Sequence, residues 1–158
     1  MRAEATRGNP NPHGWWRIAL VLVLVPSIGC SVHAPRVYQV QTDKPFADVL
    51  IDLEFAITDN NYRITGRNDI GAAIAARQNR PYPNYAVIHF CNLRDAQQIL
   101  DVAPEFLVHM PCRISVREHA GDVIIEARLV PEHRMSVRKI SRRINAMLRE
   151  IADSAAGF

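Results

Sequence analysis

The pattern of apolar and polar positions predicts alternating strands and helices over most of the chain. Apolar residues recur at every second position, as in strands with one buried face, in the segments 37–41, 62–66, 113–118 and 122–130. Residues 85–91 form a nearly continuous apolar run, which predicts a strand in a central position of the sheet.

Helical spacing of apolar residues predicts three amphipathic helices, starting near Pro45, at Leu93 after an N-cap at Asn92, and near Ser136. We expect Pro104 to break the last turn of the second helix, which otherwise extends to Leu107. The positions expected to face the core are Phe46, Val49, Leu50, Leu53 and Ile57 in the first helix, Ala96, Ile99, Leu100, Ala103 and Leu107 in the second, and Val137, Ile140, Ile144, Met147, Leu148 and Ile151 in the third.

The order of these elements is β-α-β-β-α-β-β-α, which predicts an α+β fold with an antiparallel sheet and helices packed on one face. A further short helix is expected over 72–77, followed by a proline-containing loop. Residues 37–158 are numerous enough for one domain with a single core, and 48% of the 158 residues are hydrophobic.

The first 29 residues have the features of a signal peptide. They carry Arg2, Arg7 and Arg17 against Glu4, and an apolar run from Ile18 follows that is shorter than the ~20 residues needed to span a bilayer. Their net charge is 3 − 1 = +2, so the total of +3 leaves +1 for the remainder. This charge does not predict nucleic-acid binding.

The end of this segment, Gly29-Cys30, resembles a bacterial lipobox, in which the cysteine after the cleavage site is acylated. The resemblance implies a lipid on Cys30, with residues 30–36 as a tether between the membrane and the domain. Plain cleavage, and a retained anchor with Trp15 and Trp16 at the membrane interface, are the alternatives. We expect the domain to lie in the cell envelope, on the periplasmic or extracellular side.

Two cysteines and two histidines lie at the ends of the segment 85–112, and they suggest three kinds of chemistry. In an oxidising compartment Cys91 and Cys112 can form a disulfide, or they can be two buried free thiols. Together with His89 and His109 they offer two imidazoles and two thiolates, a set that suits zinc or copper. Because neither an acidic partner nor a nucleophile elbow accompanies them, we do not expect an enzyme.

The last helix carries a cluster of basic residues, Arg138, Lys139, Arg142 and Arg143. Such a cluster is either a solvated face or a surface for anionic lipid or an acidic partner. Three arginines of the strands, at positions 113, 117 and 128, are expected to point outward and to extend this basic surface.

The segment from Tyr85 to Cys112 resembles the domain of unknown function 302 (DUF302) family, over roughly residues 37–135. In that family Cys-Asn follows a strand and Pro-Cys precedes the next one, as Cys91-Asn92 and Pro111-Cys112 do here. Leu93 stands where the family has proline. The resemblance implies an antiparallel α+β domain similar to TATA-binding-protein-like folds, often a homodimer, and no established activity.

Our first functional hypothesis is a lipid-anchored envelope domain that binds a small ligand or a protein partner through its sheet face, without catalysis or cofactor. One alternative is a metal-handling or thiol-redox protein that uses Cys91 and Cys112 with the two histidines. Another is a structural accessory subunit of a membrane complex. The expected partners are the membrane and another protein or a second copy of the chain, but not nucleic acid.

Overall fold

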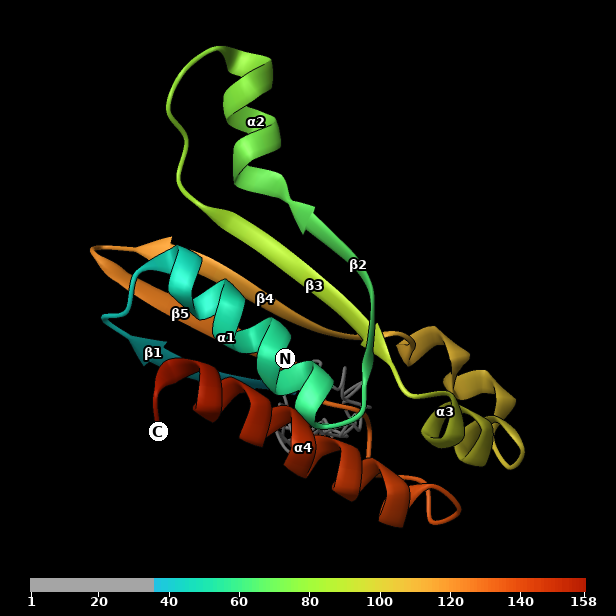
Figure 1. Ribbon diagram of the computed structural model, residues 1–158. Helices are drawn as coiled ribbons and strands as arrows, with labels where there is room; N and C mark the ends of the chain where they lie inside the picture. Colours follow the sequence, from blue (N-terminus) through green and yellow to red (C-terminus); the bar gives the residue numbers. More distant parts are fainter. Residues whose placement is uncertain (1–35) are drawn as a thin grey trace, which may run out of the picture. The chain divides into compact units, whose positions relative to one another are not determined.

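The protein contains a five-stranded antiparallel sheet with the strand order β1-β5-β4-β3-β2 (Figure 1). The computed structural model describes residues 36–158, so Cys30 and the expected signal peptide lie outside the described residues. The strands are β1 (Val37–Thr42), β2 (Arg63–Asp69), β3 (Tyr85–Cys91), β4 (Cys112–His119) and β5 (Asp122–Arg128).

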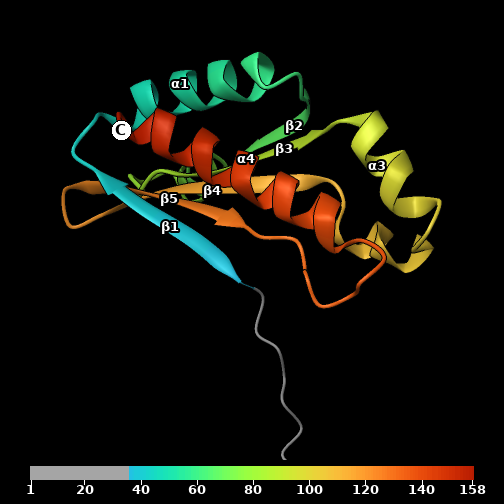
Figure 2. The same cartoon turned by 90° about the horizontal axis from the view of Figure 1, so that it is seen from below.

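Two long helices pack side by side over one face of this sheet (Figures 1 and 2). They are α1 (Phe46–Asp59) and α4 (Arg138–Ala156), and each turns its apolar stripe toward the strands. Over the part of the chain from 36 to 158, the opposite face of the sheet has no such helical layer (Figure 2). The predicted α+β class, with helices on one face of an antiparallel sheet, is therefore confirmed.

The core lies between the sheet and these two helices. From β3, Ile88 and Phe90 are fully buried, and from β4 Ile114 is buried opposite Ile88 in the register. Residues on alternate positions of each strand point to the other face, because successive side chains of a strand point in opposite directions. The predicted core positions of α1 and α4 are buried or packed against this cluster.

The expected central position of β3 is not what the structure shows. β4 is the middle strand, and β3 lies between β4 and β2. Burial alternates along β3, so Tyr85, Val87 and His89 are only partly covered. The apolar run arises because β3 is an interior strand with apolar residues on both faces, although only one face is covered by helices.

The second predicted helix is divided into two pieces. α3 (Leu93–Leu100) ends early, and Pro104 begins a short 3-10 helix, Pro104–His109. Because proline lacks an N–H and the 3-10 helix has a tighter turn, the face that meets the core shifts by one position. Phe106 is 3% exposed, whereas Leu107, which we expected in the core, is 62% exposed.

The expected short helix is α2 (Ile70–Gln78), which projects from the ends of β2 and β3 beyond the body of the domain (Figure 1). Gly71 is its buried residue, and a Cβ there would lie 2.3 Å from the backbone oxygen of Pro83. The β4–β5 hairpin, also expected, turns through Ala120 and Gly121 with positive φ angles of 53° and 96°. Among residues 36–158, the helices are too short or too polar to cross a bilayer.

Candidate functional site

The sheet register separates Cys91 and Cys112. Cys112 pairs with Phe90, so it lies on the face covered by helices, and it packs against the core. Cys91 is the next residue along β3 and therefore belongs to the other face. Both cysteines are free, and the structure does not contain the disulfide that we considered, because side chains on opposite faces cannot meet without backbone movement.

Burial keeps both thiols protonated. It raises the pKa of Cys112 to about 12, with smaller contributions from Cys91 and Asp95. Burial also raises the pKa of Cys91, and the carboxylate of Asp95 adds to the effect. Since the thiolate is the nucleophile and the metal ligand, neither cysteine is activated in this environment.

The two histidines of the proposed metal set lie apart. His89 is on the uncovered face of the sheet beside Arg113 in the register, whereas His109 ends the 3-10 helix and packs edge-on against Phe106 at 5.3 Å. Within residues 36–158, no three His, Cys, Asp or Glu side chains are grouped closely enough to hold a metal ion. The structure thus does not bring together His89, Cys91, His109 and Cys112 as a zinc or copper site.

Asn92 has the N-cap role that the sequence predicts. Its Oδ1 accepts hydrogen bonds from the backbone N–H groups of Arg94 and Asp95 at 3.0 and 3.3 Å. Its Nδ2 also donates to the backbone oxygen of Asn61 at 3.0 Å. The side chain therefore caps α3 and connects it to the turn between α1 and β2.

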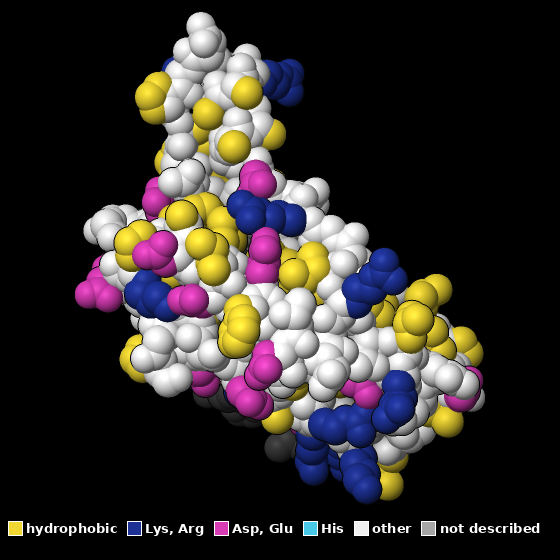
Figure 3. Space-filling view, viewed as in Figure 1, with side chains coloured by type: hydrophobic (Ala, Val, Ile, Leu, Met, Phe, Trp, Pro, Cys, Tyr) yellow, Lys and Arg dark blue, Asp and Glu magenta, His cyan; other side chains and the backbone are white. Residues whose placement is uncertain are grey.

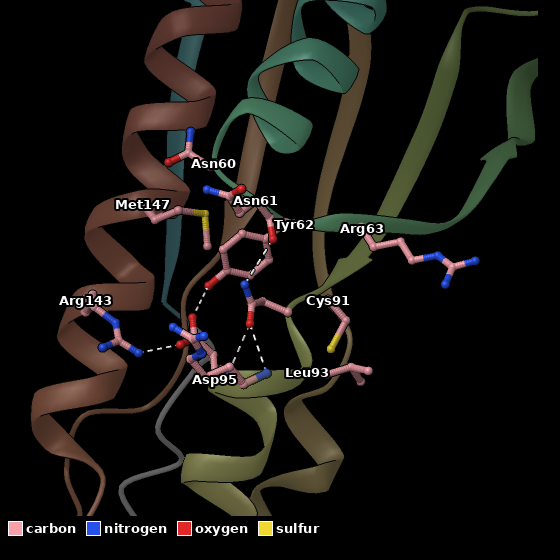
Figure 4. A pocket seen from close by; sticks show the side chains of 11 residues that line it. Asn60, Asn61, Tyr62, Arg63, Cys91, Leu93, Asp95, Arg143 and Met147 are labelled. Atoms are coloured by element: carbon pink, nitrogen blue, oxygen red, sulfur yellow. Dashed lines mark hydrogen bonds and ion pairs between the residues drawn. The ribbon is translucent and has the colours of Figure 1, made fainter.

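A cleft of about 800 Å³ lies beside this cap, and an ion-pair network forms one wall (Figure 4). The hydroxyl of Tyr62 donates to Asp95 at 2.5 Å, and Arg143 forms an ion pair with the same carboxylate. Burial and this carboxylate raise the pKa of Tyr62 above its ordinary value. Tyr62, Asp95 and Arg143 satisfy one another, so the network holds α3, α4 and the turn before β2 together and presents no activated group.

Sequence reasoning did not find this network, because Asp95 lies 33 residues after Tyr62 and 48 before Arg143. Spacing along the chain contains no signal for such contacts, which depend on how α3 meets α4. Arg143, which we expected on a free basic surface, instead forms an ion pair with Asp95.

The uncovered face of the sheet is hollowed into a groove of about 540 Å³, to which all five strands contribute. We call this hollow the sheet groove, and its lining consists of Val37, Asn68, Val87, His89, Arg113, Ser115, Glu126 and Arg128. Arg117 pairs with Glu126 at 3.3 Å, next to the groove. Arg113 and Arg128 form no salt bridge with any acidic residue of 36–158, so the groove has an excess of positive charge.

The basic residues of α4 gather at its N-terminal end (Figure 3). Arg138 donates to the backbone oxygens of Glu132 and His133 at 3.2 and 3.5 Å, and Arg142 pairs with Glu132 at 3.4 Å. Lys139 is exposed. Part of the predicted basic surface therefore fixes the loop that connects β5 to α4.

A comparison with family models finds a match over most of the domain, at residues 38–155, to the domain of unknown function DUF302. The chain belongs to the DUF302 family. The expected motif residues Cys91, Asn92, Pro111 and Cys112 all lie within the matched range, at the facing ends of β3 and β4.

A solved structure supports the DUF302 fold. The chain is similar to the crystal structure of an uncharacterized conserved DUF302 protein from Bacillus stearothermophilus, with a TM-score of 0.67 and 14% sequence identity. The similarity covers 75% of this chain and 97% of the other. No curated protein matches the chain.

Proposed function

We propose that this DUF302 protein is a non-catalytic binding domain, held at the membrane by a lipid on Cys30, that binds a small amphipathic anion in the sheet groove. The observation that carries the proposal is the groove itself, on the sheet face that α1 and α4 leave uncovered. Its volume of about 540 Å³ lies in the range of small-molecule sites.

The lining of the sheet groove favours a ligand with both an apolar body and a negative group. Val37 and Val87 supply apolar surface, and Val37 is 53% exposed. Arg113 and Arg128 supply donors that attract an anion, while Asn68 and Ser115 add neutral polar groups. A few polar groups on a partly apolar concave surface are typical of binding sites that orient a ligand.

The residues that could take part in a reaction favour binding over catalysis. The pKa values of Cys91 and Cys112 are both raised, so neither thiol is a nucleophile at neutral pH. The cleft beside Asn92 is larger than the sheet groove, but Asp95 is already shared by Tyr62 and Arg143 there. In the sheet groove, arginines without a salt-bridge partner among residues 36–158 line the free space.

A fluorescent amphipathic anion, 8-anilino-1-naphthalenesulfonate, tests this proposal on the full chain. We expect saturable fluorescence enhancement with the wild type and at least about tenfold weaker binding in Ser115→Phe, whose ring fills the groove. His119→Phe is the matched control, since it adds the same ring at an exposed position of the same strand outside the groove. Equal binding by both variants, with unchanged circular dichroism, contradicts the proposal.

A second copy of the chain is the alternative ligand of this domain, and α2 is the observation that favours it. The helix projects beyond the body and exposes Ile70 at 42%, with apolar side chains visible along this arm (Figures 1 and 3). An exposed apolar helix is typical of a surface that another chain covers. Sedimentation equilibrium should then show a dimer that Ala73→Glu dissociates and Gln78→Glu does not, whereas a monomeric wild type contradicts it.

A further inference from the structure

A second hollow, of about 590 Å³, lies between the N-terminal end of α4, the loop after β5 and the end of the 3-10 helix. We call it the basic pocket. Its positive charge comes from Arg36, Arg128, Arg138 and Arg142, and His109 and His133 line it as well. It adjoins the sheet groove, because the side chain of Arg128 lines both.

The charge of the basic pocket is not balanced by its own residues. Four arginines and one carboxylate, Glu132, line it, which gives 4 − 1 = +3 with the histidines neutral. Glu132 is already engaged, because it accepts a hydrogen bond from Asn145 at 2.7 Å and pairs with Arg142. Arg36 and Arg128 form no salt bridge with the acidic residues that the structure describes. Several guanidinium groups around a hollow are stabilised by an anion with multiple acceptor oxygens.

The walls of the basic pocket are fixed before any ligand binds. Asn145 is 1% exposed, and its amide bonds both the N–H and the carbonyl of Val130, at 2.7 and 2.9 Å. Arg138 is held by two backbone carbonyls of the same loop. A preorganised set of donors loses less conformational entropy when it binds an anion.

The two imidazoles of the pocket are placed by one aromatic ring. Phe106 contacts His109 at 5.3 Å and His133 at 6.5 Å between ring centroids. Burial, Arg128 and His133 lower the pKa of His109, so positive charge is disfavoured there while the pocket is empty. A bound anion relieves this repulsion and adds imidazole donors to those of the arginines.

We propose that the basic pocket binds a phosphate group, which either an anionic phospholipid head group or a free phosphate ester supplies. The three equivalent oxygens of a phosphate match several guanidinium donors better than a single carboxylate does. The lipid source rests on the proposed anchor at Cys30. Cys30 is six positions before Arg36, and six residues of extended chain span about 20 Å. A lipid on Cys30 would therefore keep Arg36, and with it the basic pocket, near the membrane surface.

Thermal unfolding of the full chain in detergent micelles tests the proposal, with chloride exchanged for inorganic phosphate at constant ionic strength. We expect the midpoint to rise saturably, as it does for any ligand that binds only the folded state. In Arg36→Gln/Arg142→Gln we expect at least about a tenfold loss of apparent affinity. Arg36 has no carboxylate partner among residues 36–158, and the pair of Arg142 with Glu132 is partly exposed, so we expect the double variant to fold.

Arg77→Gln is the matched control, since Arg77 is an exposed arginine of α2 outside the pocket. Dihexanoyl phosphatidylglycerol distinguishes the two sources: tighter binding than inorganic phosphate identifies the lipid head group, and weaker or equal binding identifies a free phosphate. Ser115→Phe should leave the phosphate effect unchanged, so failure of the sheet groove is separable from failure of the basic pocket. No saturable effect of either probe, or an equal effect in the double variant, overturns the proposal.

Discussion

The thiols of Cys91 and Cys112 are close in the register of the sheet, but they belong to opposite faces. A buried thiol loses the hydration that stabilises its charged form, so its pKa rises. The effect is larger at Cys112, where the pKa is about 12, than at Cys91 at the outer end of β3. At the scale of single residues, the family motif thus has structural roles: Cys112 packs against the core, and Asn92 caps α3.

Alkylation with iodoacetamide tests the protonation of these thiols. At pH 8 we expect Cys112 to react more slowly than Cys91, and both more slowly than an unhindered thiol, because only the thiolate reacts. The rate at Cys112 should still be rising above pH 9, since its pKa is about 12. Peptide mapping after quenching assigns the label, and fast labelling of Cys112 or a peptide pair linked by a disulfide contradicts this environment.

Removing the cap at Asn92 should destabilise the fold. We expect Asn92→Ala to lower the free energy of unfolding by about 1–2 kcal/mol, because two backbone donors of α3 and the carbonyl of Asn61 lose their partner. Urea denaturation measures the change. Leu93→Ala is the neighbouring control, since Leu93 is 83% exposed and we expect a change within about 0.5 kcal/mol. Equal effects of the two substitutions are incompatible with the cap.

At the scale of elements, the hydrophobic pattern identifies the strands and helices well because their period reflects which face is buried. The strand predicted at 85–91 has the bounds of β3, and the hairpin at 119–122 is confirmed. The pattern fails after Pro104, where the helix type changes and Phe106 replaces Leu107 in the core. A change of helical period cannot be read from a pattern that assumes a constant one.

Phe106 and Leu107 give a matched pair that tests this shift. We expect Phe106→Ala to cost about 3–5 kcal/mol of stability, because a buried aromatic ring is lost and a cavity remains. Leu107→Ala should cost less than about 0.5 kcal/mol, since its side chain is 62% exposed. Denaturant unfolding measures the two losses of stability. A larger loss for Leu107→Ala than for Phe106→Ala would contradict the shift and support the uninterrupted helix expected from the sequence.

The candidate site could be predicted only where it depends on local sequence. The cap at Asn92 involves residues two and three positions away, and the outward arginines follow from strand alternation. The sheet groove additionally requires the order of the strands, which brings Asn68, Val87 and Ser115 into one row across β2, β3 and β4. The basic pocket depends on the packing of the 3-10 helix against the loop after β5.

At the scale of the whole molecule, the helices of residues 36–158 cover one face of the sheet and leave a charged, hollowed face on the other. The sheet groove and the basic pocket meet at Arg128, so the two proposed ligands would share one guanidinium group. Because the wall residues of both hollows come from well-packed strands and a clamped loop, binding needs little rearrangement of the backbone.

The proposed membrane attachment belongs to this scale and depends on Cys30. In the native host, we expect the wild type in the membrane fraction with an N-terminal mass that includes acyl chains. Cys30→Ser should move the protein to the soluble fraction, because the buried methylenes of the lipid supply the membrane affinity. Replacement of a second cysteine, Cys91→Ser, is the control and should leave the acylated mass unchanged, and a wild-type N-terminal mass without acyl chains contradicts lipid anchoring.

The central claim is that the uncovered sheet face is the binding surface of this domain. NMR titration of the isotope-labelled full chain with 8-anilino-1-naphthalenesulfonate tests it most directly. We predict saturable shifts of the backbone amides of Val87, His89 and Ser115, with those of Asp95 and Arg143 unchanged. Shifts confined to the cleft beside Asn92, or no saturable shift on β3 and β4, would contradict the claim.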